Sequence, residues 1–145
     1  MPTLVDRLLA FWASVGVSPR PGASPEALAA FEDRHGVALS PDLRAYFSAA
    51  DGMDPDVRDD LFFRFVPLAE FAPSAERGGP PGSFVLAEHR LGGFSYVVRL
   101  DPEPGEVSLW DGDWVRPVAP SFPDFLGLYL SSPGKLFPSD ESAGD

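Results

Sequence analysis

The stretch Phe31–Met53, FEDRHGVALSPDLRAYFSAADGM, reads as one helix closed by a glycine, a short turn, and a second helix that Ser40-Pro41 opens and Asp51-Gly52 ends. Gly36 suits the left-handed position that ends many helices. The run Ser40–Asp42 then supplies an N-cap serine, a proline at the first helical position and an acid in the first turn. Leucine and aromatic residues at helical spacing follow until Gly52. The sequence therefore predicts a helix up to residue 35 and a second helix from residue 41.

The same start signals recur on both sides of this stretch. Ser24-Pro25-Glu26 predicts that the helix ending at residue 35 begins at residue 25. Thr3 with Asp6 and Ser121 with Asp124 resemble capping boxes, which predict helices over 4–15 and from residue 122 to the Pro133-Gly134 stop.

Between residues 61 and 118 the apolar pattern changes to the alternation that is typical of strands. Asp111-Gly112 suits the two-residue type I′ turn of a β-hairpin. The predicted strands cover residues 61–66, 84–88, 94–100, 106–110 and 113–118. Consecutive strands with short connections favour an antiparallel arrangement. We therefore expect an α+β fold with helices at both chain ends, packed on a largely antiparallel sheet of about four to six strands.

Length and composition fit one domain. The chain has 145 residues, 44% of them hydrophobic, and no cysteine, which excludes disulfides and thiolate metal ligands. We expect a single domain over 1–136 and an acidic, disordered tail over 137–145. No apolar run is long enough to span a membrane and no export signal is visible, so we expect a cytoplasmic protein without membrane contact.

The charge is the strongest compositional signal. Asp and Glu number 22 against 11 Lys and Arg, which gives a formal net charge of −11. Nucleic acid binding needs the opposite balance, so we do not expect a nucleic acid partner. A basic protein would be attracted to such a surface. The alternative is that the charge only keeps the domain soluble.

No catalytic or metal-binding pattern stands out, and we expect neither a catalytic residue, a metal nor a cofactor. The two histidines, His35 and His89, lack the spacing of metal ligands. His35 sits at a predicted helix end, where an imidazole suits the helix dipole. A hydrolase using scattered carboxylates is the enzymatic alternative.

The candidate binding residues are acidic and aromatic. The acids are Asp54, Asp56, Asp59 and Asp60, which form either a contact patch for a cationic partner or a solvated loop. Trp110 and Trp114 flank the predicted hairpin turn. They either pack within the sheet or serve as exposed interface anchors.

One set of residues follows a pattern known from a protein family: Phe31, Glu32, Gly36, Val37, Leu39, Pro41, Asp42, Leu43, Tyr46, Phe47, Asp51 and Gly52. Through these residues, and over a region from residue 25 to residue 130, the chain resembles the SUKH superfamily, which includes yeast cell-wall assembly regulators and many bacterial immunity proteins. An asparagine often precedes the last glycine in this family, whereas here Asp51 does. The resemblance implies a non-catalytic domain that neutralises one toxin by stoichiometric binding. A regulatory scaffold that binds a cellular protein is the alternative within the same family.

Overall fold

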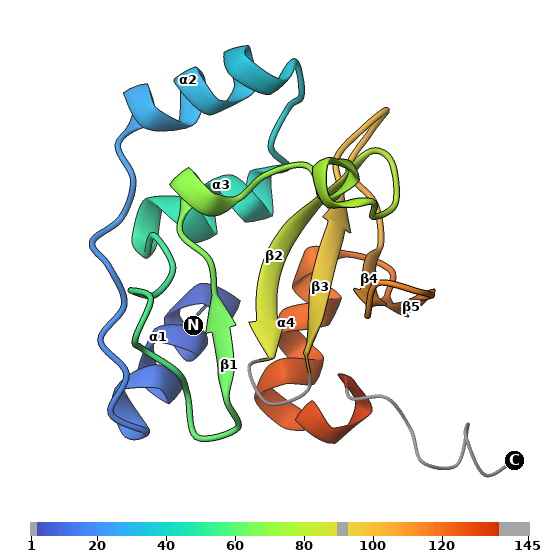
Figure 1. The fold of residues 1–145 in the computed structure, drawn as a ribbon. Helices are drawn as coiled ribbons and strands as arrows, with labels where there is room; N and C mark the ends of the chain where they lie inside the picture. Colours follow the sequence, from blue (N-terminus) through green and yellow to red (C-terminus); the bar gives the residue numbers. More distant parts are fainter. Residues whose placement is uncertain (1–2, 90–92, 137–145) are drawn as a thin grey trace, which may run out of the picture.

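The computed structural model describes residues 3–89 and 93–136, and it has the expected α+β fold (Figure 1). Five strands form one sheet in the order β1-β2-β3-β4-β5, and every neighbouring pair is antiparallel. This confirms the predicted antiparallel sheet. The strands are β1 Phe63–Phe65, β2 Ser83–His89, β3 Phe94–Arg99, β4 Val107–Trp110 and β5 Val115–Ala119.

Three helices precede the sheet and one follows it, as expected. They are α1 Leu4–Ser14, α2 Pro25–His35, α3 Pro41–Ala49 and α4 Phe122–Ser131. Short 3-10 helices, which the sequence analysis did not predict, are η1 Leu68–Glu70, η2 Ser74–Arg77 and η3 Pro133–Leu136. The expected tail over 137–145 lies outside the described residues.

The predicted helix caps are present. The side chains of Thr3, Ser24, Ser40 and Ser121 each accept a hydrogen bond from a backbone N–H in the first turn of their helix. Gly36 ends α2 in the left-handed conformation, with φ of +64°. Short polar sequence signals therefore set both ends of α2 and the starts of the other helices.

The main core lies between the sheet and helices α1 and α4. Phe65 of β1 packs at ring-centroid distances of 5.3 Å from Trp12 of α1 and 5.0 Å from Tyr129 of α4. Tyr46 of α3 contacts the same phenylalanine at 6.1 Å. These four side chains are buried, and they join three helices to the first strand.

Helix α2 packs on the rest of the molecule through aromatic contacts of Phe31 and His35 and through one carboxylate. Phe31 stacks on Phe71 with centroids 5.3 Å apart. The Glu32 carboxylate accepts from the backbone N–H of Leu39 at 2.7 Å and from the Arg44 guanidinium at 2.6 Å. Both hydrogen bonds hold α2 and α3 in a fixed relation.

A smaller cluster covers the opposite face of the sheet. It consists of Val85, Val97 and Trp110, one residue from each of the three central strands. A Cβ on Gly79 would lie 2.8 Å from the Ser74 Cβ and 3.0 Å from Cη2 of the Trp110 ring, so the segment after η2 packs closely against this ring. The loop between η2 and β2 thereby screens Trp110 from solvent.

Both edges of the sheet are modified. At the β1 edge, the backbone N–H groups of Met53 and Asp59 donate to the carbonyls of Phe65 and Phe63, at 2.8 and 3.0 Å. At the other edge, β5 contains Pro117, which has no N–H group to donate. The residues before β1 therefore occupy its outer edge.

Two local predictions need correction. The strand predicted from residue 61 begins only at Phe63, because Phe62 has φ of +70° and turns the chain. The hairpin turn is not type I′, which requires positive φ at both central residues. Gly112 has positive φ but Asp111 does not, and Trp110 pairs with Val115 across a four-residue loop.

Candidate protein-interaction surface

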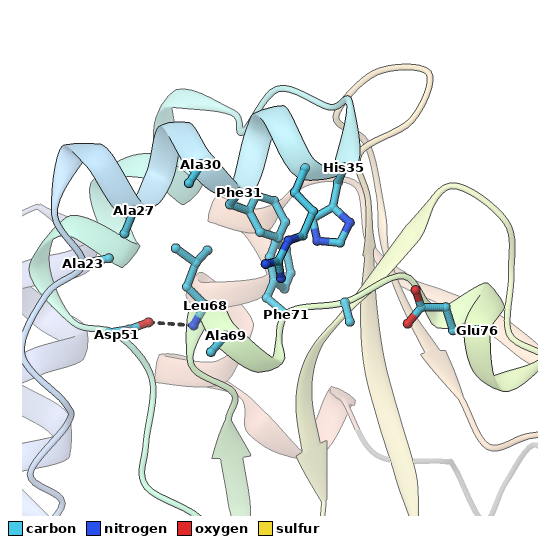
Figure 2. Close-up of a pocket in the computed structure, with 12 residues that line it drawn as sticks. Ala23, Ala27, Ala30, Phe31, His35, Asp51, Leu68, Ala69, Phe71 and Glu76 are labelled. Carbon is cyan, nitrogen blue, oxygen red and sulfur yellow. Dashed lines mark hydrogen bonds between the residues drawn. The ribbon is translucent and has the colours of Figure 1, made fainter.

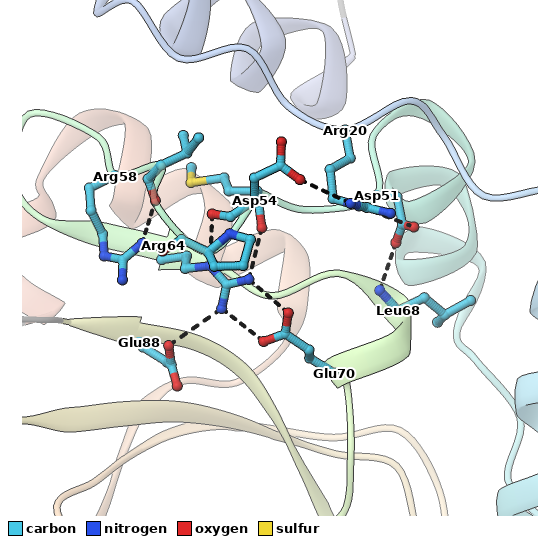
Figure 3. Close-up of polar contacts among 11 residues, drawn as sticks. Arg20, Asp51, Asp54, Arg58, Arg64, Leu68, Glu70 and Glu88 are labelled. Atoms are coloured by element: carbon cyan, nitrogen blue, oxygen red, sulfur yellow. Dashed lines mark hydrogen bonds and ion pairs between the residues drawn. The ribbon is translucent and has the colours of Figure 1, made fainter.

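The acidic segment 54–60 follows α3 and leads into β1. Asp54, Asp56 and Asp60 are exposed. Asp54 pairs with Arg20 at 2.9 Å, and Arg20 also lies 3.9 Å from Asp51 (Figure 3). Within the part of the chain that the structure describes, Asp56 and Asp60 have no ion-pair partner. These two carboxylates are available to a cation from outside.

Asp59 is not part of this exposed set, which corrects the expectation that it lies on an acidic face. Asp59 exposes only 5% of its surface to solvent. One carboxylate oxygen accepts from the backbone N–H groups of Leu61 and Phe63 at 2.8 and 2.9 Å. The other accepts from the Tyr129 hydroxyl. A buried carboxylate needs such donors, and here they fix the turn before β1.

Tyr129 extends this buried chain of hydrogen bonds to α1. The Trp12 indole N–H donates to the Tyr129 hydroxyl oxygen at 2.9 Å. Burial raises the pKa of Tyr129 well above its ordinary value, and the neighbouring Asp59 charge raises it further. The hydroxyl therefore stays protonated and donates to Asp59. Helices α1 and α4 are thus connected to the acidic segment through one buried carboxylate.

Arg64 fixes the backbone at the start of the acidic segment through buried hydrogen bonds. This β1 side chain is 4% exposed, and its guanidinium donates to the carbonyls of Met53 and Asp54 at 3.0 and 3.1 Å. It also makes two hydrogen bonds to Glu70, at 2.9 and 2.8 Å, and lies 3.6 Å from Glu88 (Figure 3). The hydrogen bonds from Arg64 hold the pKa of Glu70 below its usual range. The backbone of the segment is therefore fixed by a buried, charge-neutralised arginine.

Phe62 is a surface residue that the sequence analysis missed. It is 46% exposed and is the one residue other than glycine with positive φ in the described part of the chain. Bulky residues adopt this conformation at a cost of about 1–3 kcal/mol. Its N–H donates to the Asp59 carbonyl at 3.1 Å, so the buried aspartate and its neighbours impose the conformation. No glycine or asparagine, the residue types that favour positive φ, marks this position in the sequence.

The two candidate tryptophans have different environments. Trp110 is 8% exposed and belongs to the small cluster behind the sheet, which supports the packing alternative for this residue. Trp114 is 40% exposed, and the Arg116 guanidinium lies 5.7 Å from the centre of its ring. The Asp111 carboxylate accepts from the N–H groups of Asp113 and Trp114, which sets the loop conformation.

The acidic segment and Trp114 are not close together. The sheet order places the acidic segment beside β1 and Trp114 beside β5, at opposite edges. Four strand spacings of about 4.8 Å separate these edges by roughly 19 Å. The structure therefore does not combine the predicted acids and tryptophans into one compact site.

The histidines pack against aromatic rings. The ring centre of His35 lies 4.6 Å from that of Phe31, and His89 stacks on Phe94 with ring centres 5.0 Å apart.

Among the described residues no group of three or more His, Asp or Glu side chains is arranged to hold a metal ion. No helix in the described part of the chain is both long and apolar enough to cross a membrane.

A groove of about 540 Å³ lies between α2 and the residues around η1 (Figure 2). Ala27 and Ala30 of α2 form one wall, and Leu68 and Phe71 lie opposite. Its charged lining has both signs, from Arg34, Asp51 and Glu76. Asp51 has a structural role, because its carboxylate accepts a hydrogen bond from the Leu68 N–H at 2.6 Å (Figure 2). We call this the α2 groove.

The chain belongs to the SMI1 / KNR4 family (SUKH-1), whose family model matches residues 22–128, well over half of its length. The match includes α2, α3, the whole sheet and most of α4. It confirms the resemblance that the residues between Phe31 and Gly52 indicated. A comparison with curated proteins returned no match.

Proposed function

We propose that this protein is a non-catalytic immunity protein of the SUKH-1 family that neutralises a basic toxin domain by stoichiometric binding. Membership of the family is consistent with immunity or interaction roles. The observation that carries the proposal is that Asp56 and Asp60 are exposed and have no ion-pair partner among the described residues. They belong to a chain with a formal net charge of −11. We place the protein in the cytoplasm, where it would meet a delivered toxin.

The first contact surface in this proposal is the exposed part of the segment before β1. Asp54, Asp56 and Asp60 supply negative charge, and the exposed ring of Phe62 supplies an aromatic anchor. Aromatic side chains are enriched among the residues that dominate interface energies. Asp59 and Arg64 hold this surface rigid from beneath, which lowers the entropy lost on binding.

The proposal is tested by capture of partners from the native host on the tagged protein at low salt, followed by elution at high salt. We expect one dominant basic protein that is toxic when expressed alone and harmless when this chain is coexpressed in equal amount. Several abundant cellular proteins without toxicity would favour the scaffold alternative instead. Toxicity that persists despite a stable complex would contradict neutralisation.

The contact surface is tested by association kinetics with the captured partner. Electrostatic steering makes association fast and sensitive to salt. We expect the double variant Asp56→Lys, Asp60→Lys to associate about tenfold more slowly at low salt. The matched control Asp33→Lys, Glu103→Lys changes the net charge equally at exposed positions on other surfaces. Equal rates for the two double variants would remove the acidic segment from the interface.

A further inference from the structure

A second groove, of about 450 Å³, lies where α1, α3 and α4 meet. We call it the α3 groove. Its lining is mainly apolar and comes from three helices: Leu4 and Val5 of α1, Ala45 and Ala49 of α3, and Phe122 and Leu126 of α4. The volume is within the range of about 300–1,000 Å³ that is typical of ligand-binding clefts.

Small side chains on α3 create the hollow. Ala45 and Ala49 are four residues apart, so they lie on one face of the helix, and both are exposed. With Asp42 they form a strip of about two turns, or roughly 10 Å, that carries no bulky side chain. A partner helix can approach α3 closely along this strip, because interaxial distance depends on the side chains at the contact.

The charged residues that line the α3 groove have one sign. Among the described residues they are Asp6 and Asp42, both acidic and both exposed. Asp6 accepts from the Thr3 N–H at 3.0 Å through one oxygen, so its charge is fixed at the start of α1. The α2 groove, in contrast, carries Arg34 and His35 together with acids. Charge complementarity to a basic segment therefore distinguishes the α3 groove from the α2 groove.

The α3 groove is joined to the acidic segment by a short stretch of chain. Ala49, at one end of the groove, precedes Asp54 by five residues. Five residues span at most about 18 Å of extended chain. A partner domain of about 100 residues, with a radius of gyration of about 13 Å, is wide enough to span this distance.

We propose that the α3 groove receives an amphipathic helix of the basic partner. Its apolar side chains lie over Ala45 and Ala49, between Leu4 and Leu126, and its Lys or Arg side chains face Asp6 and Asp42. Helix-in-groove recognition of this kind uses apolar anchors at i, i+3 or i+4, and i+7. The inference rests on the proposed function for the class of partner, and it adds the element that the partner inserts.

The test uses a defined probe, a fluorescein-labelled 18-residue helical peptide with leucines at i, i+3, i+4 and i+7 spacing and lysines elsewhere. Its affinity is measured by fluorescence anisotropy for the full chain and for Ala45→Trp, which fills the groove at an exposed helical position. The matched control is Ala30→Trp, the same substitution at an exposed alanine of the α2 groove. Circular dichroism verifies that both variants fold.

We expect Ala45→Trp to weaken peptide binding at least about tenfold, or about 1.4 kcal/mol, and Ala30→Trp to change it less than about twofold. Alanine-methyl NMR should show the peptide shifting Ala45 and Ala49 but not Ala27 and Ala30. A version of the peptide with glutamates in place of the lysines should bind at least tenfold more weakly. Equal effects of the two tryptophan variants, absence of binding, or shifts confined to the α2 groove would overturn the proposal.

Sedimentation of the free protein tests a second copy of the chain as the occupant. A dimer that Ala45→Trp dissociates would overturn the proposal in favour of self-association. The inference and the proposed function can also fail separately. If Ala45→Trp neutralises a captured toxin as well as the wild type does, the α3 groove is excluded and the immunity role stands.

Discussion

At the scale of single residues, Asp59 shows how a charged side chain can organise an exposed surface while remaining inside the protein. Its carboxylate satisfies two backbone N–H groups and the Tyr129 hydroxyl. Burial without these donors would cost several kcal/mol. The carboxylate therefore defines the conformation from which Asp60 and Phe62 project to solvent.

We expect Asp59→Ala to lower the free energy of unfolding by about 2–4 kcal/mol, because it leaves buried donors of Phe63 and Tyr129 without an acceptor. Urea unfolding monitored by circular dichroism measures the loss. The neighbouring exposed Asp60→Ala is the control and should stay within about 0.5 kcal/mol of the wild type. Similar losses at both positions would show that Asp59 has no special structural role.

Residue-level sequence reasoning recognised the acids but not their separate roles. Asp is rarely buried, so four aspartates in a short segment indicate an exposed acidic patch. What removes Asp59 from this patch is Tyr129, which lies 70 residues later in the chain. Contacts at such separations leave no trace in a local pattern of residue types.

At the scale of elements, the helices were predictable and the sheet connections less so. Serine caps with following prolines identify α2 and α3 because capping depends on adjacent residues alone. The two-residue turn predicted at Asp111-Gly112 is absent for a physical reason. The Asp111 carboxylate accepts from the N–H groups of Asp113 and Trp114, which stabilises a longer loop than the two-residue turn.

The connection between α2 and α3 predicts a pH-dependent stability. The hydrogen bond from the Leu39 N–H, with a further contribution from Arg44, lowers the pKa of Glu32 below its ordinary value. A lowered pKa in the folded state stabilises the protein above the unfolded pKa of about 4.3, and the contribution is lost as pH falls through the folded pKa.

We therefore expect Glu32→Gln to lower the free energy of unfolding by about 1 kcal/mol at pH 7, with the difference from wild type shrinking towards pH 3. Urea unfolding at both pH values provides the comparison. Asp33→Asn, at an exposed position on the same helix, should have an effect within about 0.5 kcal/mol at either pH. If the effect of Glu32→Gln does not change with pH, the negative charge of Glu32 does not contribute to the connection between α2 and α3.

At the scale of the whole molecule, like charges repel over the surface. The net charge is −11, whereas surface ion pairs such as Arg20–Asp54 contribute about 0–1 kcal/mol each. Salt shortens the screening length from about 30 Å at 0.01 M to about 10 Å at 0.1 M. Screening of the repulsion should therefore outweigh screening of the ion pairs.

We expect the urea midpoint of unfolding to rise as NaCl increases from about 0.01 to 0.3 M, the range over which long-distance repulsion is screened. In the double variant Asp56→Lys, Asp60→Lys each substitution replaces one negative charge with one positive charge, so the net charge changes from −11 to −7. The rise should be smaller in this variant. A midpoint that falls with salt in the wild type would mean that the ion pairs dominate.

The two sheet edges have a consequence for how variants of a partner could escape recognition. Residues 53 and 59 already occupy the β1 edge, and Pro117 interrupts the donors of β5. A partner therefore gains little by adding a strand, a mode of binding that depends on main-chain atoms and tolerates sequence change. In the proposed immunity role, recognition therefore relies on side chains, and we expect that a single substitution in the toxin is enough to weaken protection. Families under such pressure are expected to diverge fastest on their surfaces while the buried Asp59–Tyr129 contact stays constant.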